Sequence, residues 1–389
     1  MSCPRVSIVM AVYNGGPFLA QSVQSVLDQT YRDFEFVIID DGSIDNTWAV
    51  LSTFAKGEPR IVLIRNQPNI GVVRSLNIGL NQSKGEVIVR QDADDISHPD
   101  RIQKQLAFLD SHPEYGLVGA VPKPVGLDGS PLDLAGWDAT DNEEIQVKLP
   151  DYMCLCGPSI AFRRSCLEEA GFYFSEGLDA SEDYDLCLRL AEVTKLASLE
   201  GSLYLYRQHP ESASSRRAHQ QMVNKAIALE RALLRRYGAN PPGDMLTLNS
   251  RDYLHAAIIG FVRKDRDGAE RSLKRAIEVY PLLLNKEQPL EGLVRAYTPR
   301  HSIDAALEYT VSLFDELLPK SRRLARMKSR LLSNLHMGEV FAGARQKQFW
   351  RVDAHLGPGI QYSPFWLLNR GVLSILAKRF LRQRAVKIG

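Results

Sequence analysis

The first hundred residues alternate between short apolar runs and segments with helical spacing. Apolar runs rich in β-branched residues occupy positions 6–13, 34–39, 61–65 and 87–90, and a segment with apolar residues every three or four positions follows each of the first three. The runs are nearly continuous, which is typical of parallel strands covered on both faces. This alternation predicts an α/β fold with a mostly parallel, doubly wound sheet and right-handed crossovers.

The pattern becomes less regular in the second hundred residues. We expect strands over 115–121, 159–162 and 199–206, and helices over 99–112, over 165–170 and from Ser181 onward. Residues 122–150 are rich in Gly, Pro and Asp, so we expect a surface loop there that could shape a ligand site.

Beyond Ser215 the spacing is helical and the strand signal is weak. The expected helices cover residues 220–237, 252–262, 269–280, 303–318 and 321–335. No second copy of any segment recurs at a fixed period, which argues against a repeat array. The pattern therefore predicts an α/β domain over residues 1–215 and an all-helical C-terminal region over residues 216–389.

Cysteine usage and hydropathy bound the cellular setting. Five cysteines without a paired spacing are typical of free thiols in a reducing compartment. No apolar run approaches the roughly 18 to 20 residues that a membrane-spanning helix needs. The N-terminus runs directly into the first strand and leaves no room for a targeting peptide. We therefore expect a cytoplasmic protein.

The net charge of +2 hides a strongly basic C-terminal end. From Lys320 to Gly389 there are 15 Lys and Arg against two acidic residues, so this part carries +13 and the preceding 319 residues carry −11. Residues 370–387 mix apolar and basic side chains, as in helices that lie on the anionic inner face of a cell membrane. A solvated basic face and a tail packed on the acidic body are the alternatives. No recognised nucleic-acid fold accompanies the charge, so we expect no nucleic-acid partner.

Polar residues follow three of the predicted strands. They are Tyr13-Asn14, Asp40-Asp41 and Asp92-Ala93-Asp94-Asp95. In doubly wound sheets, ligands bind beyond the carboxyl ends of the strands, where all three segments fall. Three carboxylates within four positions repel one another unless a cation lies among them, and oxygen ligands suit Mg²⁺ or Mn²⁺. The alternative for the last segment is a solvated acidic turn before the next helix.

In this order and spacing, the motifs resemble those of family 2 glycosyltransferases with the type A nucleotide-sugar fold. The resemblance covers residues 5–210, about half of the chain. It rests on Val6 to Asn14, Val37 to Ser43, Asn69-x-Gly71 with Asn77-x-Gly79, Asp92 to Asp95, Glu182 to Leu186 and Tyr206-Arg207-x-His209.

The resemblance implies a nucleotide-diphosphate sugar as donor, and we expect a UDP-sugar. Ala11, Tyr13 and Asn14 would then hold the nucleotide base, and Asp40 would accept a hydrogen bond from a ring N–H. Arg74 is a further candidate for a diphosphate contact. The alternative for Tyr13 is an aromatic core residue at a strand end.

The resemblance also implies a divalent cation, Mn²⁺ or Mg²⁺, that bridges the two phosphates. Asp94 is the expected direct ligand, and Asp92 would bind the ion directly or through water. Arg207 and His209 are expected to reach the pyrophosphate or the ion, although a histidine in a polar loop is often simply exposed. Asp95 is expected to accept a hydrogen bond from the backbone instead.

Asp183 resembles the general base that takes the proton from the acceptor hydroxyl. One displacement with one base implies inversion at the anomeric carbon. The alternative is that Glu182 and Asp183 merely stabilise a helix start. One departure from the family pattern is Gly157, because many members have a histidine just before this Pro-Ser stretch. No Gln-x-x-Arg-Trp motif is present either, which argues against a processive polymer synthase.

The leading hypothesis is an inverting, metal-dependent glycosyltransferase. Its acceptor would be a hydroxyl group on a saccharide or on a lipid-linked saccharide in surface polysaccharide synthesis. The alternative from another class is a non-catalytic nucleotide-sugar-binding or scaffold protein that acts through its helical region. A sugar nucleotidyltransferase is disfavoured because Asn14-Gly15-Gly16-Pro17 contains no basic residue for a phosphate loop.

Overall fold

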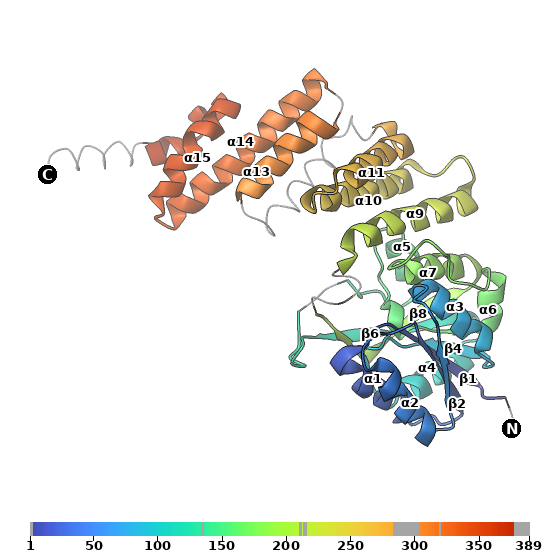
Figure 1. Ribbon diagram of the computed structural model, residues 1–389. Helices are drawn as coiled ribbons and strands as arrows, with labels where there is room; N and C mark the ends of the chain where they lie inside the picture. Colours follow the sequence, from blue (N-terminus) through green and yellow to red (C-terminus); the bar gives the residue numbers. More distant parts are fainter. Residues whose placement is uncertain are drawn as a thin grey trace. The chain divides into compact units, whose positions relative to one another are not determined.

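The computed structural model describes residues 3–133, 136–209, 212, 216–282, 303–318 and 320–376 (Figure 1). The chain forms two compact units, Met1–Asp252 and Tyr253–Gly389. The strands end at residue 207, close to the domain boundary predicted at 215, while the first compact unit also takes in helix α9 (Ala218–Tyr237) and the first half of α10 (Gly243–Val262).

An eight-stranded mixed sheet forms the centre of the first unit, which confirms the α/β fold class. The strand order is β3-β2-β1-β4-β7-β6-β8-β5. Strands β3, β2, β1 and β4 are parallel, as are β6 and β8, while β7 and β5 run antiparallel to their neighbours. The strands are β1 (Val6–Val12), β2 (Phe34–Asp40), β3 (Ile61–Arg65), β4 (Val87–Arg90), β5 (Ile96–Ser97), β6 (Tyr115–Val125), β7 (Ala161–Arg163) and β8 (Lys195–Arg207).

Helices cover both faces of this sheet, which explains why its strands are nearly continuous apolar runs. On one face, side chains such as Val9 and Ile88 pack against α3 (Val72–Gln82), α7 (Glu182–Val193) and α9. On the other face, side chains such as Ile8 and Val89 pack against α1 (Leu19–Leu27), α2 (Thr47–Gly57) and α4 (Arg101–Ser111). Successive residues of a strand point to opposite faces, so each strand supplies both cores.

The prediction of a surface loop over 122–150 was wrong at both ends. Strand β6 continues to Val125, and α5 (Asn142–Lys148) begins where the Asp141 carboxylate accepts the Glu144 N–H at 2.9 Å. The prolines at 122 and 124 suggested a loop. Strand β6 pairs with β7 at Leu117 and Val118, before these prolines, so one edge of β6 tolerates them. Another short helix of the first unit, α6 (Arg164–Glu169), follows β7.

The described part of the second unit is helical, as the spacing predicts. It contains the rest of α10, α11 (Arg266–Val279), α13 (Ile303–Ser312), the π-helical turn η5 (Leu313–Leu317), α14 (Arg322–Arg345), α15 (Phe349–Tyr362) and the 3₁₀ turn η6 (Pro364–Leu368). Helices α14 and α15 pack through Met337, Val340, Val352 and Leu356. Helix α15 was not predicted, because Gly357-Pro358-Gly359 is typical of a helix end.

The basic tail is described only in part. Residues 370–376 are helical, and residues 377–389 of the predicted membrane-surface helix lie outside the described residues. Among the helices that the structure describes, none has the length and apolar character needed to cross a membrane.

Candidate active site

An acidic loop follows β4, and we define it as residues 92–95. One carboxylate oxygen from each of Asp92, Asp94 and Asp95 lies within 4.8 Å of the others. Burial and the neighbouring carboxylate of Asp94 raise the pKa of Asp92 to about 6, against the opposing effect of Arg90. Burial, followed by the charges of Asp94 and Asp92, also raises the pKa of Asp95. The loop therefore concentrates negative charge that a cation would stabilise.

Buried polar side chains form hydrogen bonds with the backbone of the acidic loop. Gln91 donates from Nε2 to the carbonyl oxygens of Asp92 and Asp95, at 3.0 and 3.2 Å. Arg101, only 1% exposed, donates to Gln91 Oε1 at 3.0 Å and to the Arg90 carbonyl oxygen at 2.8 Å. Its guanidinium lies 4.7 Å from the centre of the Tyr204 ring. This network of hydrogen bonds restrains the backbone of the acidic loop.

The end of β8 is joined to the acidic loop. The Arg207 N–H donates to Asp95 Oδ1 at 2.8 Å, so Asp95 does accept a backbone hydrogen bond, although the donor lies far along the chain. His209 Nε2 lies 2.9 Å from Asp94 Oδ2. The Arg207 guanidinium is buried, donates to the Asp94 carbonyl oxygen at 2.9 Å and stacks on Phe18 at 4.3 Å. In this structure Arg207 joins β8, the loop and the turn that precedes α1.

Arg90 connects the acidic loop to the start of α7. Its guanidinium lies 3.1 Å from Asp92 Oδ1 and 3.3 Å from Glu182 Oε1. Burial opposes the positive charge, but Asp92 and Glu182 outweigh it and raise the pKa of Arg90. Burial and the adjacent Asp183 raise the pKa of Glu182 to about 7, while Arg90 lowers it. One buried cation thus links the acidic loop to the helix turn that carries Asp183.

The tips of β1 and β2 form a second, more open part of the site. The Tyr13 side chain is 49% exposed, so it is not the core aromatic of the alternative interpretation. Asn14 has a positive φ of 51°, donates its N–H to Ser43 Oγ at 2.9 Å and accepts the Ile44 N–H at 3.0 Å. Ala11, partly buried near the end of β1, packs against the core. Asn14 therefore fixes the two strand ends beside an exposed aromatic ring.

Asp40 and Asp41 are both buried at the end of β2. Asp40 accepts the Ser43 N–H at 3.0 Å, and its other oxygen lies 3.1 Å from Arg65 Nε. Asp41 accepts the N–H groups of residues 70 and 71, both at 2.9 Å, and so shapes the turn into α3. Arg74, on α3, pairs with Glu176 on the surface at 3.0 Å.

Known proteins resemble this chain in sequence. The model of Glycosyl transferase family 2 matches residues 7–171. An uncharacterized glycosyltransferase of Haemophilus influenzae is 30% identical over 229 residues, which cover 57% of this chain and 70% of the relative. The putative glycosyltransferase EpsE of Bacillus subtilis is 33% identical over 240 residues, 60% of this chain and 84% of the relative. The chain belongs to glycosyltransferase family 2.

The fold of this glycosyltransferase also resembles a solved structure. The crystal structure of residues 1–349 of TarS from S. aureus superposes with a TM-score of 0.50 and 16% sequence identity, covering 94% of this chain and 92% of that chain. At this identity the likeness concerns the fold alone.

Gly157 of the enzyme lies against Asp183. A Cβ atom at position 157 would lie 1.8 Å from Asp183 Oδ2 and 2.6 Å from its Cγ. The other carboxylate oxygen, Oδ1, accepts the Tyr184 N–H at 2.8 Å. Only glycine fits at position 157 with Asp183 in this position, because any larger side chain would displace the Asp183 carboxylate.

Sequence reasoning found the acidic loop but missed the residues that hold it. Arg90 ends a buried strand, and Arg101 and Gln105 lie four residues apart on the apolar face of α4. A charged residue among core positions was the available signal, since such residues are buried only when they are paired. Their partners lie far along the chain and could not be read from local spacing.

Proposed function

We propose that the enzyme transfers a sugar from a nucleotide-diphosphate donor, a UDP-sugar, to a hydroxyl acceptor with inversion at the anomeric carbon. The acceptor is a saccharide or a lipid-linked saccharide. The observation that carries the proposal is the buried contact of Arg90 with both Asp92 and Glu182. This contact supports a single site in which the diphosphate and the acceptor base lie close together.

The acidic loop suits a divalent cation. Its three carboxylates supply oxygen donors within 4.8 Å of one another, the chemistry that Mg²⁺ and Mn²⁺ prefer. Asp94 and Asp92 would hold the ion, with His209 beside Asp94 as a further ligand. The ion would supply positive charge opposite the diphosphate of the departing nucleotide. The contacts of Arg207 favour a role in holding Asp94 and Asp95 in place.

Donor binding is assigned to the strand tips. The exposed ring of Tyr13 supports a stacking or lining contact with the base. Ala11 and Asn14 flank it, and Asn14 is held by Ser43 and Ile44. Asp40 is the proposed acceptor for a ring N–H. Because Asp40 is buried beside Arg65, this contact requires the Arg65 side chain to move when the nucleotide binds. Arg74 would leave Glu176 to reach the diphosphate.

Asp183 is the proposed base. Its Oδ1 accepts the Tyr184 N–H, so Oδ2 is the oxygen that receives the acceptor proton. As the proton leaves, the acceptor oxygen forms a bond to the anomeric carbon and the bond from that carbon to the diphosphate breaks. The bond forms and breaks on opposite faces of the sugar ring, which inverts the configuration.

A thermal-shift screen of UDP-sugars with Mn²⁺, followed by measurement of UDP release, tests the proposal. Donor binding stabilises the fold by mass action. Asp183→Asn should lower transfer at least about a hundredfold and keep the donor-induced shift. Asp94→Asn should remove the Mn²⁺-dependent part of the shift. Full transfer by Asp183→Asn would assign the base elsewhere, and binding without any turnover would favour the scaffold alternative.

A further inference from the structure

Helix α9 holds the turn that carries Asp183 at two points. The Asn224 side chain donates from Nδ2 to the Asp179 carbonyl oxygen at 2.8 Å, and the Ser181 hydroxyl donates to the Gln221 carbonyl oxygen at 2.8 Å. Both donor side chains are buried. Helix α9 also packs beside α7, the helix that begins at this turn (Figure 1). The backbone that leads to the proposed base is therefore attached to a helix that follows the last strand of the sheet.

Lys225 lies one residue further along α9 and contacts Tyr184, the residue that follows the proposed base. Its ammonium lies 5.5 Å from the centre of the Tyr184 ring and donates to the Asp151 carbonyl oxygen at 2.9 Å. The buried carboxylate of Asp252, on α10, pairs with the same ammonium. A lysine that is mostly buried, as here, is stable only when it is paired and hydrogen-bonded. These contacts therefore fix the position of the ammonium.

The Tyr184 hydroxyl and the Lys225 ammonium bind neighbouring carbonyl oxygens. Tyr184 donates to that of Leu149 at 2.9 Å, two residues before the carbonyl oxygen that accepts from Lys225. The chain then continues to Gly157, where an added Cβ would lie 1.8 Å from Asp183 Oδ2. So close a fit requires the two stretches of chain that meet at Asp183 to keep their relative position.

We propose that Lys225 is a positioning residue for the transfer reaction. Through Tyr184 and the Asp151 carbonyl oxygen it holds the two stretches of chain that meet at Asp183, and so it sets where Oδ2 meets the attacking hydroxyl group. The inference rests on the proposed function, in which Asp183 is the base. A displacement of about 1 Å can lower the rate about a hundredfold, so a smaller shift already reduces kcat. The contacts of Lys225 described above involve neither the strand tips nor the acidic loop, so donor binding should not change.

Steady-state UDP release by the full chain tests the inference. The donors are UDP-glucose, UDP-galactose and UDP-N-acetylglucosamine with Mn²⁺, and the acceptors are water and a panel of mono- and disaccharides. Lys225→Met keeps the apolar stem and removes the ammonium, so kcat should fall about tenfold while the KM for the donor stays within about twofold. Arg235→Met is the matched control, because it removes a cation of α9 that pairs at 2.9 Å with Glu192 at the other end of α7. It should leave both constants unchanged.

A double variant separates positioning from stability. Lys225→Met alone leaves the buried Asp252 carboxylate without its ammonium partner, which lowers the midpoint of thermal unfolding. Lys225→Met/Asp252→Asn removes both charges, so its midpoint should lie above that of the single variant while kcat stays low. Recovery of kcat together with the midpoint would reduce Lys225 to a stabilising residue and overturn the inference.

The remaining outcomes distinguish this inference from the proposed function. A wild-type kcat in Lys225→Met, or an equal loss in Arg235→Met, overturns the inference alone when Asp183→Asn is inactive. Full transfer by Asp183→Asn, or no UDP release by the wild type with any donor and acceptor, overturns the proposed function and the inference with it.

Discussion

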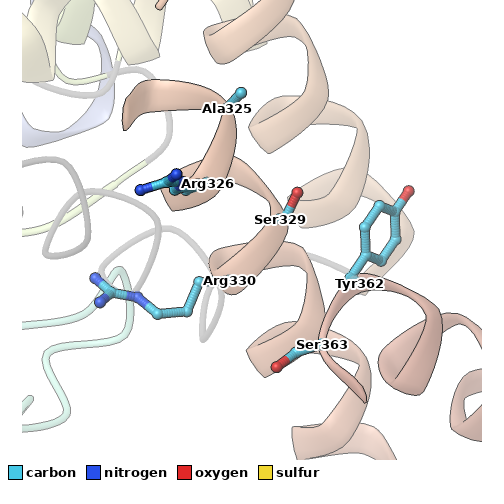
Figure 2. A pocket seen from close by; sticks show the side chains of 6 residues that line it. All are labelled: Ala325, Arg326, Ser329, Arg330, Tyr362 and Ser363. Carbon is cyan, nitrogen blue, oxygen red and sulfur yellow. The ribbon is translucent and has the colours of Figure 1, made fainter. Parts of the chain in front are cut away.

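The two units of the chain use charged side chains in opposite ways. Next to the acidic loop, the first unit buries Arg90 and Arg101 and pairs each with carbonyl or carboxylate oxygens. In the second unit, Arg326 and Arg330 are exposed on α14 (Figure 2). Buried charge is costly unless it is paired and hydrogen-bonded, so it is used where side chains must be held in a defined position. An exposed charge costs little free energy, because it remains hydrated.

The largest effect is expected from removing the buried guanidinium of Arg101. Arg101→Leu leaves the carbonyl oxygens of Arg90 and Pro158 without their guanidinium donor and leaves Gln91 Oε1 with only the Ser97 hydroxyl. At about 1–3 kcal/mol for each unmatched buried acceptor, the free energy of unfolding should fall by about 3–5 kcal/mol. Lys104→Met, on the exposed side of the same helix, should change it by less than about 0.5 kcal/mol. Urea unfolding of the full chain measures both. Similar values for the two variants would remove the contrast between buried and exposed charge.

A smaller effect, confined to catalysis, is expected at Gly157. In Gly157→Ala the new Cβ overlaps Asp183 Oδ2, so the proposed base must move by about 1 Å and kcat should fall about a hundredfold. The KM for the donor should stay the same, because the three atoms nearest to the added Cβ all belong to Asp183. Gly57→Ala is the control, since no atom lies within 4 Å of its added Cβ. An unchanged kcat would show that the carboxylate position does not limit the reaction.

The open tips of β1 and β2 provide a third test. Tyr13→Ala should weaken UDP binding about tenfold, the loss of one base–aromatic contact, and should leave the midpoint of thermal unfolding almost unchanged because the ring is half exposed. Tyr173→Ala removes a ring of similar exposure from another part of the same unit and should not alter UDP binding. Isothermal titration gives both affinities. Equal UDP affinities for the two variants would show that Tyr13 does not contact the nucleotide base.

The sequence predicts most of the sheet and the positions of the acidic residues, because these depend on local pattern. Val87 to Val89 form a strand and the aspartates follow it, as the apolar run and its polar end indicate. The contacts that decide what each side chain does are not local. Arg101 meets Tyr204, and Asp95 meets the N–H of Arg207, across more than a hundred residues. No spacing rule connects such partners, so their pairing came only from the structure.

The smallest effect concerns a partly buried pair of histidines within the second unit. His336 Nδ1 lies 2.9 Å from His355 Nδ1, so one ring must donate and the other accept. Burial, followed by His355, lowers the pKa of His336, while Asp304 opposes the shift. The unfolded chain therefore binds a proton more readily, and the stability that neutral His336 contributes is present above about pH 6.5 and is lost as the pH falls below it.

Thermal unfolding at different pH values tests this pair. Between pH 7 and 5, His336→Gln should reduce the loss of unfolding free energy by less than about 1 kcal/mol, because the ring is partly exposed. His112→Gln, a histidine of the first unit, should leave that slope in place. An identical slope in the wild type and in His336→Gln would show that this pair does not couple protonation to folding.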